Sequence, residues 1–293
     1  MLARNFIWLK NVCTVKDMAT LKGIIGTFKV AKNPFSIIFA KFTGKRKKIS
    51  LVNGAKFQIT WPQFRFLRDH YFLVEKYYLE QVSDESFKIH VDGYQMVGSL
   101  VLVCTWEEIQ TGIYDYEFKN KVVLDIGGFE GESAVYFWSK GAKKVIIYEP
   151  VLYHLNYIKE NVFVNKIDAE IHGEGIGDKD GNLTVAYNQT DNSFGLETGR
   201  ELTKKLTIKI RDIAKVIAES KADVAKIDCE GAELSLVSVP KEILRTLEYV
   251  IVEAHSLDIR KALIKKFKES DFAFVKGNKE ESQEISVLYF KRL

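Results

Sequence analysis

The sequence has little cysteine and no long apolar run. Its three cysteines, Cys13, Cys104 and Cys229, lie far apart, which fits neither a disulfide framework nor the close spacing of a zinc site. No apolar stretch approaches the roughly 20 residues that a helix needs to cross a bilayer. Lysines also interrupt the N-terminal stretch before the apolar segment of a signal peptide could form. We therefore expect a cytosolic protein with reduced thiols.

Acidic residues are almost absent from the first fifty positions. Residues 1–50 hold eleven Lys or Arg against one acid, Asp17, and so carry a charge of +10. The whole chain of 293 residues carries +4, so the remaining 243 residues carry −6. The basic segment also holds many aromatic residues, such as Trp8, Phe28 and Phe35. We expect a basic amphipathic arm over residues 1–46. It either makes peripheral contact with an anionic membrane or docks on the folded body with its lysines in water. No recognised motif supports nucleic-acid binding.

The 46% apolar and 28% charged content is typical of a soluble globular protein. Residues 47–61 predict a hairpin around Asn53-Gly54, since this pair tolerates positive φ at both turn positions. Residues 64–82 have helical periodicity, and residues 88–91 and 96–104 predict strands around Asp92-Gly93. We therefore expect an accessory region over residues 47–105.

From residue 106 to the end, strands and helices alternate, which indicates one domain with a largely parallel sheet and helices on both faces. A hairpin over residues 183–187 and 206–210, around a polar loop, interrupts this order. Ligands in such sheets bind beyond the carboxyl ends of the strands. Five polar or glycine residues are expected at those ends: Asp125, Glu149, Gly175, Asp228 and Glu253.

A glycine-rich turn over residues 125–131 follows the first of these strands. A dinucleotide site needs Gly-x-Gly-x-x-Gly, whereas the first position here is Asp125. Glu130 and Glu132 add negative charge where a pyrophosphate would lie. This charge disfavours a pyrophosphate and suits a cofactor with a cationic ammonium and sulfonium. Glu149, at the end of the next strand, is placed to accept hydrogen bonds from two ribose hydroxyls.

The Asp-x-Gly-x-x-x-Gly turn, followed by a strand that ends in Glu, resembles motif I and the acidic ribose loop of class I S-adenosylmethionine-dependent methyltransferases. The resemblance implies that S-adenosylmethionine is the cofactor. It also implies a set of residues that would bind it: Asp125, Gly127, Gly128, Gly131, Glu149, Gly175 and Ile176. The glycines would let the backbone pass close to the methionine part of the cofactor.

A second motif, Lys-Ile-Asp-Cys-Glu-Gly-Ala-Glu at residues 226–233, is similar to that of the FkbM family of methyltransferases. In that family the motif is followed by a strand that ends in a Glu-x-His-like element, here Glu253-Ala254-His255. The resemblance covers residues 122–290. It implies a Rossmann-like sheet of about seven mostly parallel strands, the last antiparallel, with an N-terminal helical and hairpin extension. The implied reaction is O-methylation of a hydroxyl on a sugar, glycolipid or other small metabolite.

The candidate catalytic residues are Asp228, Glu230 and His255, with Glu253 beside them. They act either as a general base, with His255 favoured because its ordinary pKa lies nearest neutrality, or as ligands for Mg²⁺ or Mn²⁺ through Asp228 and Glu253. Asp228 and Glu230 could instead cap the following helix, and His255 could be a structural histidine. Glu233 is expected to make a surface or cofactor-side hydrogen bond.

Two other functions stay open from the sequence. One is a non-catalytic module that keeps the fold and recruits a partner or an anionic surface through the arm. The other is an RNA ribose methyltransferase. Methylation of base amino groups is disfavoured, because no Asn/Asp-Pro-Pro-aromatic element follows the fourth strand.

Overall fold

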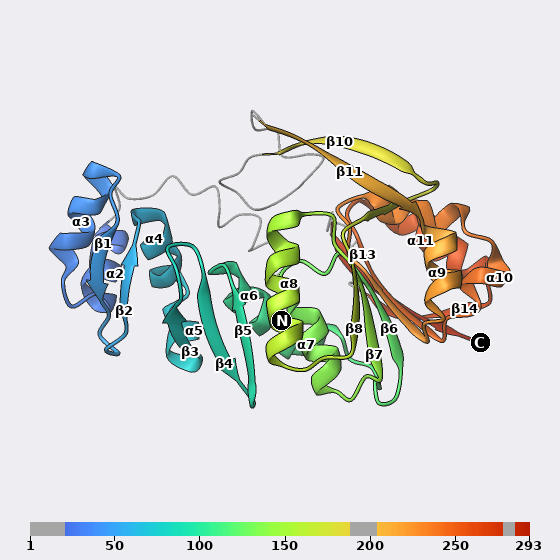
Figure 1. Ribbon diagram of the computed structural model, residues 1–293, viewed down its shortest axis with the longest axis horizontal. Helices are drawn as coiled ribbons and strands as arrows, with labels where there is room; N and C mark the ends of the chain where they lie inside the picture. Colours follow the sequence, from blue (N-terminus) through green and yellow to red (C-terminus); the bar gives the residue numbers. More distant parts are fainter. Residues whose placement is uncertain (1–20, 188–203, 278–284) are drawn as a thin grey trace. The chain divides into compact units, whose positions relative to one another are not determined.

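The computed structural model describes residues 21–187, 204–277 and 285–293, and the chain divides into two compact units after Gly112 (Figure 1). The N-terminal unit spans Leu2–Gly112 and the C-terminal unit Ile113–Leu293. The expected arm, accessory region and catalytic domain, with boundaries at residues 46 and 105, stay predictions. None of the helices in the described part of the chain combines the length and the hydropathy that a bilayer crossing needs.

The N-terminal unit combines two short antiparallel sheets with helices. The predicted hairpin is confirmed, since Lys47 pairs with Ile59 and Ser50 with Lys56. A three-stranded sheet in the order β3-β4-β5 follows, with the predicted Asp92-Gly93 turn between its last two strands. The elements are α2 (Leu21–Val30), α3 (Pro34–Thr43), β1 (Lys47–Ser50), β2 (Lys56–Ile59), α4 (Trp61–Asp69), α5 (Tyr71–Lys76), β3 (Tyr78–Gln81), β4 (Phe87–Val91), β5 (Tyr94–Gly98), α6 (Val101–Glu108) and η1 (Ile109–Ile113).

Two predicted elements of this unit are wrong in part. The helix expected over residues 64–82 is two helices, α4 and α5, followed by strand β3, which pairs with β4. A capping box between Thr60 and Gln63 begins α4. The strand expected over residues 96–104 ends at Gly98, and α6 follows with Leu102, Val103 and other side chains buried. A short apolar run fits a buried helix as well as a strand, and its periodicity cannot separate the two.

The C-terminal unit is built on a seven-stranded sheet in the order β14-β15-β13-β12-β6-β7-β8. Of these strands, β15 alone runs opposite to the other six, which confirms the predicted sheet. The strands are β6 (Val122–Ile126), β7 (Lys144–Tyr148), β8 (Ala169–His172), β12 (Val224–Ile227), β13 (Tyr249–Ala254), β14 (Phe272–Gly277) and β15 (Ser286–Arg292). The carboxyl ends of β6, β7, β12 and β13 therefore meet at one edge, as expected.

Helices cover both faces of this sheet (Figure 1). Helices α7 (Glu132–Ser139) and α8 (Leu152–Val164) pack against β6, β7 and β8. The other face holds the main core, where Leu124 and Ile126 of β6 pack with residues of α9 (Ile213–Ser220), η2 (Ala232–Ser238), α10 (Lys241–Leu244) and α11 (Leu257–Glu269). Side chains alternate along a strand, so Asp125 lies on the face of β6 that α7 covers.

A three-stranded sheet in the order β10-β11-β9 accompanies the main sheet. It consists of β9 (Gly175–Gly177), β10 (Gly181–Tyr187) and β11 (Lys204–Asp212). Strands β10 and β11 form the predicted hairpin, and β9 pairs with β11 in parallel. The polar loop predicted between the hairpin strands lies outside the described residues.

Candidate active site

The glycine-rich turn between β6 and α7 needs glycine for contacts within the protein. Gly127 has a φ of 80°, and a Cβ there would lie 1.7 Å from the backbone oxygen of Asp228. Gly131, the residue before α7, has a φ of 91°, and its Cβ would lie 3.2 Å from the Cα of Ile158. A Cβ on Gly128 would lie 2.4 Å from a methyl carbon of Ile147. Close packing of the turn against β7, α8 and the residue after β12 thus explains these glycines before any cofactor is considered.

Glu149 follows β7 and accepts hydrogen bonds from backbone amides, one of them in the glycine-rich turn. Its Oε2 accepts a hydrogen bond from the backbone amide of Phe129 at 3.1 Å, and its Oε1 accepts one from that of Val151 at 2.9 Å. The residue is 5% exposed. Each carboxylate oxygen can accept a second hydrogen bond. The side chain is therefore oriented in advance and keeps acceptor capacity for a ligand.

Asp125 is fully buried and paired with a lysine from the neighbouring strand. Its Oδ2 accepts a 2.5 Å hydrogen bond from the Ser133 hydroxyl, and its Oδ1 lies 3.3 Å from Nζ of Lys226. Lys226 also donates to the backbone oxygen of Gly127 at 2.6 Å. Burial alone would lower the pKa of Lys226, but nearby Asp125, Tyr114 and Asp228 hold it well above its usual value. The two sequence motifs are therefore joined by one buried ion pair.

Buried acids outnumber buried cations around this turn. Four acids there are at most 7% exposed: Asp125, Glu130, Glu132 and Glu149. Among the described residues, Lys226 is the one buried lysine or arginine. Glu132 lies in the first turn of α7, and burial raises its pKa to about 8. Its Oε2 is buried without a hydrogen-bond partner in the structure. Such a site disfavours phosphates and favours a cationic ligand.

A second polar cluster lies at the carboxyl ends of β12 and β13, around His255. The Nδ1 of His255 lies 3.0 Å from Oε1 of Glu233, which also accepts the His255 backbone amide at 2.9 Å. The Nε2 faces three further carboxylates, with Asp228 at 3.7 Å, Glu230 at 3.6 Å and Glu253 at 3.7 Å. The structure therefore brings together all the predicted catalytic residues.

The prediction for Glu233, a surface or cofactor-side hydrogen bond, is wrong. Glu233 is 0% exposed, and its Oε2 accepts the backbone amide of Gly231 at 2.8 Å. Burial would raise the pKa of Glu233, but the hydrogen bond from His255 and its charge lower it. Glu233 therefore positions the imidazole.

The argument for His255 from the ordinary histidine pKa is also wrong. Burial alone would lower the pKa of His255, but the Glu233 hydrogen bond and the charges of Glu253 and Asp228 raise it to about 9. The imidazole is therefore protonated at neutral pH in the protein alone. It cannot accept a proton from an acceptor hydroxyl in that form.

Three of these side chains lie close enough together to hold a metal ion. One ligand atom from each of Asp228, Glu253 and His255 lies within 4.8 Å of the others. The two carboxylates are ligands that Mg²⁺ or Mn²⁺ prefers, whereas an imidazole is a more usual ligand of Zn²⁺ or Fe²⁺. The carboxylate of Glu233 on Nδ1 is the kind of partner that orients a metal-binding histidine. A cavity of ≈ 10 Å³, with room for about one water, is lined by Asp228, Glu253 and neighbouring side chains.

Gly175 and Ile176, predicted to bind the cofactor, lie on β9. Gly175 pairs with Ile210, and a Cβ on it would lie 3.8 Å from Pro150 in the acidic loop. Ile176 is 4% exposed and belongs to the main core. His172, the last residue of β8, stacks on Tyr148 with ring centroids 4.5 Å apart. The cofactor roles of Gly175 and Ile176 stay predictions.

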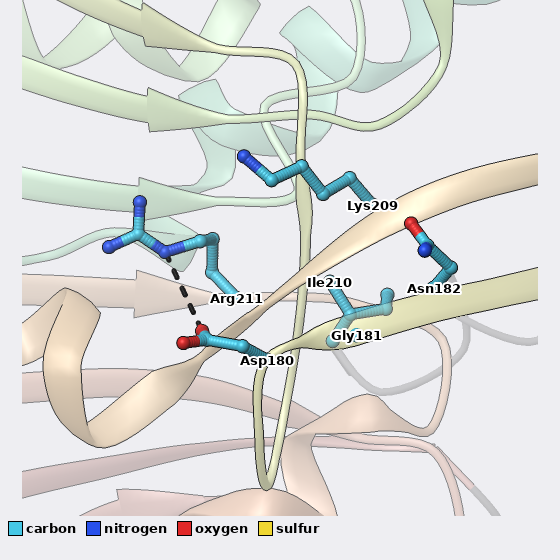
Figure 2. A pocket seen from close by; sticks show the side chains of 6 residues that line it. All are labelled: Asp180, Gly181, Asn182, Lys209, Ile210 and Arg211. Carbon is cyan, nitrogen blue, oxygen red and sulfur yellow. Dashed lines mark ion pairs between the residues drawn. The ribbon is translucent and has the colours of Figure 1, made fainter.

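A hollow of ≈ 540 Å³ lies elsewhere, along β10 and β11 (Figure 2). Figure 2 shows the Arg211 side chain directed at the Asp180 carboxylate, 3.7 Å away. Arg211 also pairs with Glu219, and Lys209 pairs with Glu174. None of the predicted site residues lines this hollow. Its basic groups have acidic partners already, so it offers no strong anion site.

The buried Asp125–Lys226 ion pair predicts a loss of stability when one partner is removed. Lys226→Met leaves a buried carboxylate without its cation, so we expect the free energy of unfolding to fall by roughly 3–5 kcal/mol in urea denaturation. The double variant Asp125→Asn/Lys226→Met removes both charges and should lose less than the sum of the single losses. Lys215→Met, at an exposed ion pair, is the control, with a loss under about 1 kcal/mol. Additive losses in the double variant would contradict the pairing.

The raised pKa of the buried Glu132 predicts that the stability of the protein depends on pH. Its pKa rises from 4.5 to about 8 on folding, so the folded state holds this proton more tightly than the unfolded state. Stability from this group is full below pH 4.5 and is lost as the pH rises toward 8. We expect Glu132→Gln to gain stability relative to the parent between pH 5 and pH 8 in urea denaturation. Glu160→Gln, exposed on α8, is the control. A difference that does not change with pH would refute the assignment.

Both the sequence and the fold of the chain were compared with those of known proteins. The sequence matches no curated protein. Among solved structures, the chain is similar to a candidate RNA methyltransferase from Pyrococcus horikoshii, with 14% identity, a TM-score of 0.41 and coverage of 65% of this chain and 85% of that one. It is also similar to a ribosomal protein L11 methylase from Lactobacillus delbrueckii subsp. bulgaricus, with 16% identity, a TM-score of 0.38 and coverage of 62% and 76%.

These structural likenesses are too weak to carry an argument about function. The family comparison is stronger, because residues 125–272, half of the chain, match the family model described as the methyltransferase FkbM domain. The matched region begins at Asp125 and contains the glycine-rich turn, Glu149, the Lys226 motif and His255. The chain therefore belongs to the FkbM family of S-adenosylmethionine-dependent methyltransferases.

Proposed function

We propose that the protein is an O-methyltransferase that acts on a hydroxyl of a sugar, a glycolipid or another small metabolite. The observation that carries the proposal is the cluster of Asp228, Glu230, Glu253 and His255 at the carboxyl ends of β12 and β13. A hydroxyl is a weak nucleophile until its proton is removed or polarised. Carboxylates and an imidazole at one point supply groups for this task.

The cofactor is proposed to bind along the glycine-rich turn and the acidic loop. The contacts would come from Asp125, Gly127, Gly128, Gly131, Glu149, Gly175 and Ile176. Glu149 is held by two backbone amides and keeps acceptor capacity for ribose hydroxyls. The excess of buried acid around the turn suits the ammonium and sulfonium of S-adenosylmethionine.

The methyl transfer is an in-line displacement. The acceptor oxygen forms a bond to the methyl carbon, and the bond from that carbon to sulfur breaks with its electron pair going to sulfur. The protein has to hold oxygen and carbon about 3 Å apart before the reaction. The hydroxyl proton leaves for a group of the protein, and the carboxylates of Asp228 and Glu253 are proposed to receive it.

A divalent cation offers the alternative for activating the hydroxyl. Asp228, Glu253 and Nε2 of His255 would hold Mg²⁺ or Mn²⁺, which would lower the pKa of the acceptor hydroxyl. Glu233 would fix the imidazole so that Nε2 faces the site. Glu230 is more exposed than the other three acids and would face the acceptor.

Two other functions follow from different features. A non-catalytic module would bind the cofactor without turnover, but it has no need for the aligned cluster around His255. An RNA ribose methyltransferase would use the basic N-terminal segment, but RNA phosphates would be repelled by the acids around His255. We therefore favour a small or lipid-linked acceptor.

The cofactor assignment predicts a specific loss of binding. Glu149→Gln keeps the size of the side chain and removes its charge, so a ribose contact would weaken. We expect the Kd for S-adenosylmethionine, measured by calorimetric titration, to rise about tenfold or more. Glu160→Gln on α8 is the matched control and should leave the Kd unchanged. Equal affinity of Glu149→Gln and the parent, or tighter binding of NAD, would contradict the assignment.

The reaction class is tested with S-adenosylmethionine that carries a labelled methyl group. We expect label in sugar or glycolipid fractions, as an ether that resists mild base, and none in RNA. Asp228→Asn should lower kcat by about a hundredfold or more, because it removes a proton acceptor or a ligand. Asp258→Asn, in the first turn of α11, is the control and should keep full activity.

The same assay distinguishes activation of the hydroxyl by a metal ion from activation by a carboxylate base. With a bound cation, EDTA abolishes transfer, Mg²⁺ or Mn²⁺ restores it, and Glu253→Gln weakens Mn²⁺ binding measured without the cofactor. Activity that EDTA does not change would exclude the metal. Label in RNA or protein fractions alone would overturn the acceptor class.

A further inference from the structure

Helix α3 in the N-terminal unit carries a row of phenylalanines that points into solvent. Phe35, Phe39 and Phe42 are 74%, 55% and 78% exposed, and their spacing of four and three residues puts them on one face of the helix. Ile37 and Ala40 on the opposite face are 0% exposed. The helix thus already packs through small or aliphatic side chains, and its largest apolar groups remain uncovered.

Helix α2 extends this face. Ile25 and Phe28 are 45% and 47% exposed, and the rings of Phe28 and Phe35 meet edge to face with centroids 5.7 Å apart. We call these five side chains the aromatic face: Ile25, Phe28, Phe35, Phe39 and Phe42. Exposed apolar side chains that adjoin one another mark a binding surface rather than random exposure.

The charge around the aromatic face has a single sign. Residues 18–68 contain eleven Lys or Arg and no Asp or Glu. Lys47 and Lys41 lie over the rings of Phe39 and Phe42, with Nζ 4.7 Å and 5.7 Å from the ring centroids. Among the described residues of this unit, the ion pairs involve Arg46, Arg68 and Lys76. The lysines near the aromatic face in the sequence are among those without such a pair: Lys29, Lys32, Lys41, Lys45, Lys47 and Lys48.

We propose that the aromatic face binds an anionic lipid membrane. Helix α3 lies in the plane of the membrane surface, its phenylalanine rings enter the boundary between head groups and acyl chains, and the lysines contact the lipid phosphates. Phenylalanine side chains are wholly apolar, so their transfer from water to the acyl-chain boundary is favourable over the whole ring. Charge complementarity and apolar insertion together select a lipid surface. The proposal does not rest on the methyl transfer reaction.

The proposal is tested by flotation of the full chain with vesicles. We expect binding to vesicles of phosphatidylcholine with phosphatidylserine and much weaker binding to phosphatidylcholine alone. Phe35→Ser/Phe42→Ser should lower the partition coefficient at least about tenfold, because both rings leave the apolar boundary. Phe72→Ser/Phe163→Ser replaces two exposed phenylalanines outside the aromatic face and should have no effect. Exposed positions keep the variants folded, and circular dichroism checks this.

The contribution of the lysines to vesicle binding is tested with a second variant and its matched control. Lys41→Gln/Lys45→Gln/Lys48→Gln should lower binding to the anionic vesicles roughly a hundredfold, since each lysine near such a surface contributes about fivefold. Lys159→Gln/Lys261→Gln/Lys268→Gln removes the same charge from exposed sites on α8 and α11 and should bind almost as the parent does.

Three outcomes would overturn the proposal. One is a parent chain that does not float with the anionic vesicles. Another is binding of a single-stranded RNA, lost with the lysine variant but not with the phenylalanine variant, in the absence of vesicle binding. The third is a parent chain that sediments as a dimer and does not bind vesicles, with a phenylalanine variant that sediments as a monomer. A second copy of the chain would then be the partner.

Discussion

The C-terminal unit depends on the buried ion pair between Asp125 of β6 and Lys226 of β12. The two residues face each other across adjacent parallel strands, and Lys226 also holds the backbone oxygen of Gly127. One contact thus fixes the glycine-rich turn against the strand that carries the second motif. A buried charge that loses its partner is far more costly than one at the surface, so neither residue can change alone. The spacing of the proposed cofactor and acceptor sides follows from this pair.

Asp228 connects the two polar clusters. Its Oδ2 lies 3.9 Å from Nζ of Lys226, and its Oδ1 lies 3.7 Å from Nε2 of His255. The backbone oxygen of the same residue occupies the space that a side chain on Gly127 would need. A shift of the glycine-rich turn would therefore move a residue of the proposed catalytic cluster. Charge in one cluster also affects the other, since Lys226 and His255 both have their pKa raised by Asp228.

The sequence predicted the parallel sheet and the meeting of Asp228, Glu253 and His255, because the ends of neighbouring parallel strands lie at the same edge. It could not predict the role of Glu233. This side chain reaches His255 because Glu230 and Gly231 adopt φ of 53° and 106° and η2 begins as a 3-10 helix, and neither feature has a period in the sequence. The sequence also could not predict the pKa of His255, since that pKa depends on the carboxylates of Glu233, Glu253 and Asp228, which come from separate elements. The lysine in an otherwise apolar β12 was the available signal for the ion pair.

The two units differ in the sign of their charge, and this difference bears on the acceptor. The segment around the aromatic face has no acid, whereas the catalytic cluster gathers four carboxylates around one imidazole. A polyanion such as RNA would be attracted by the first and repelled by the second, so its phosphates could not lie beside the reacting hydroxyl at low cost. A neutral sugar hydroxyl at an anionic membrane meets no such conflict, because its charged neighbours stay with the lipid surface. Opposite charge in the two units therefore supports the proposed lipid-linked or small neutral acceptor over a nucleic acid.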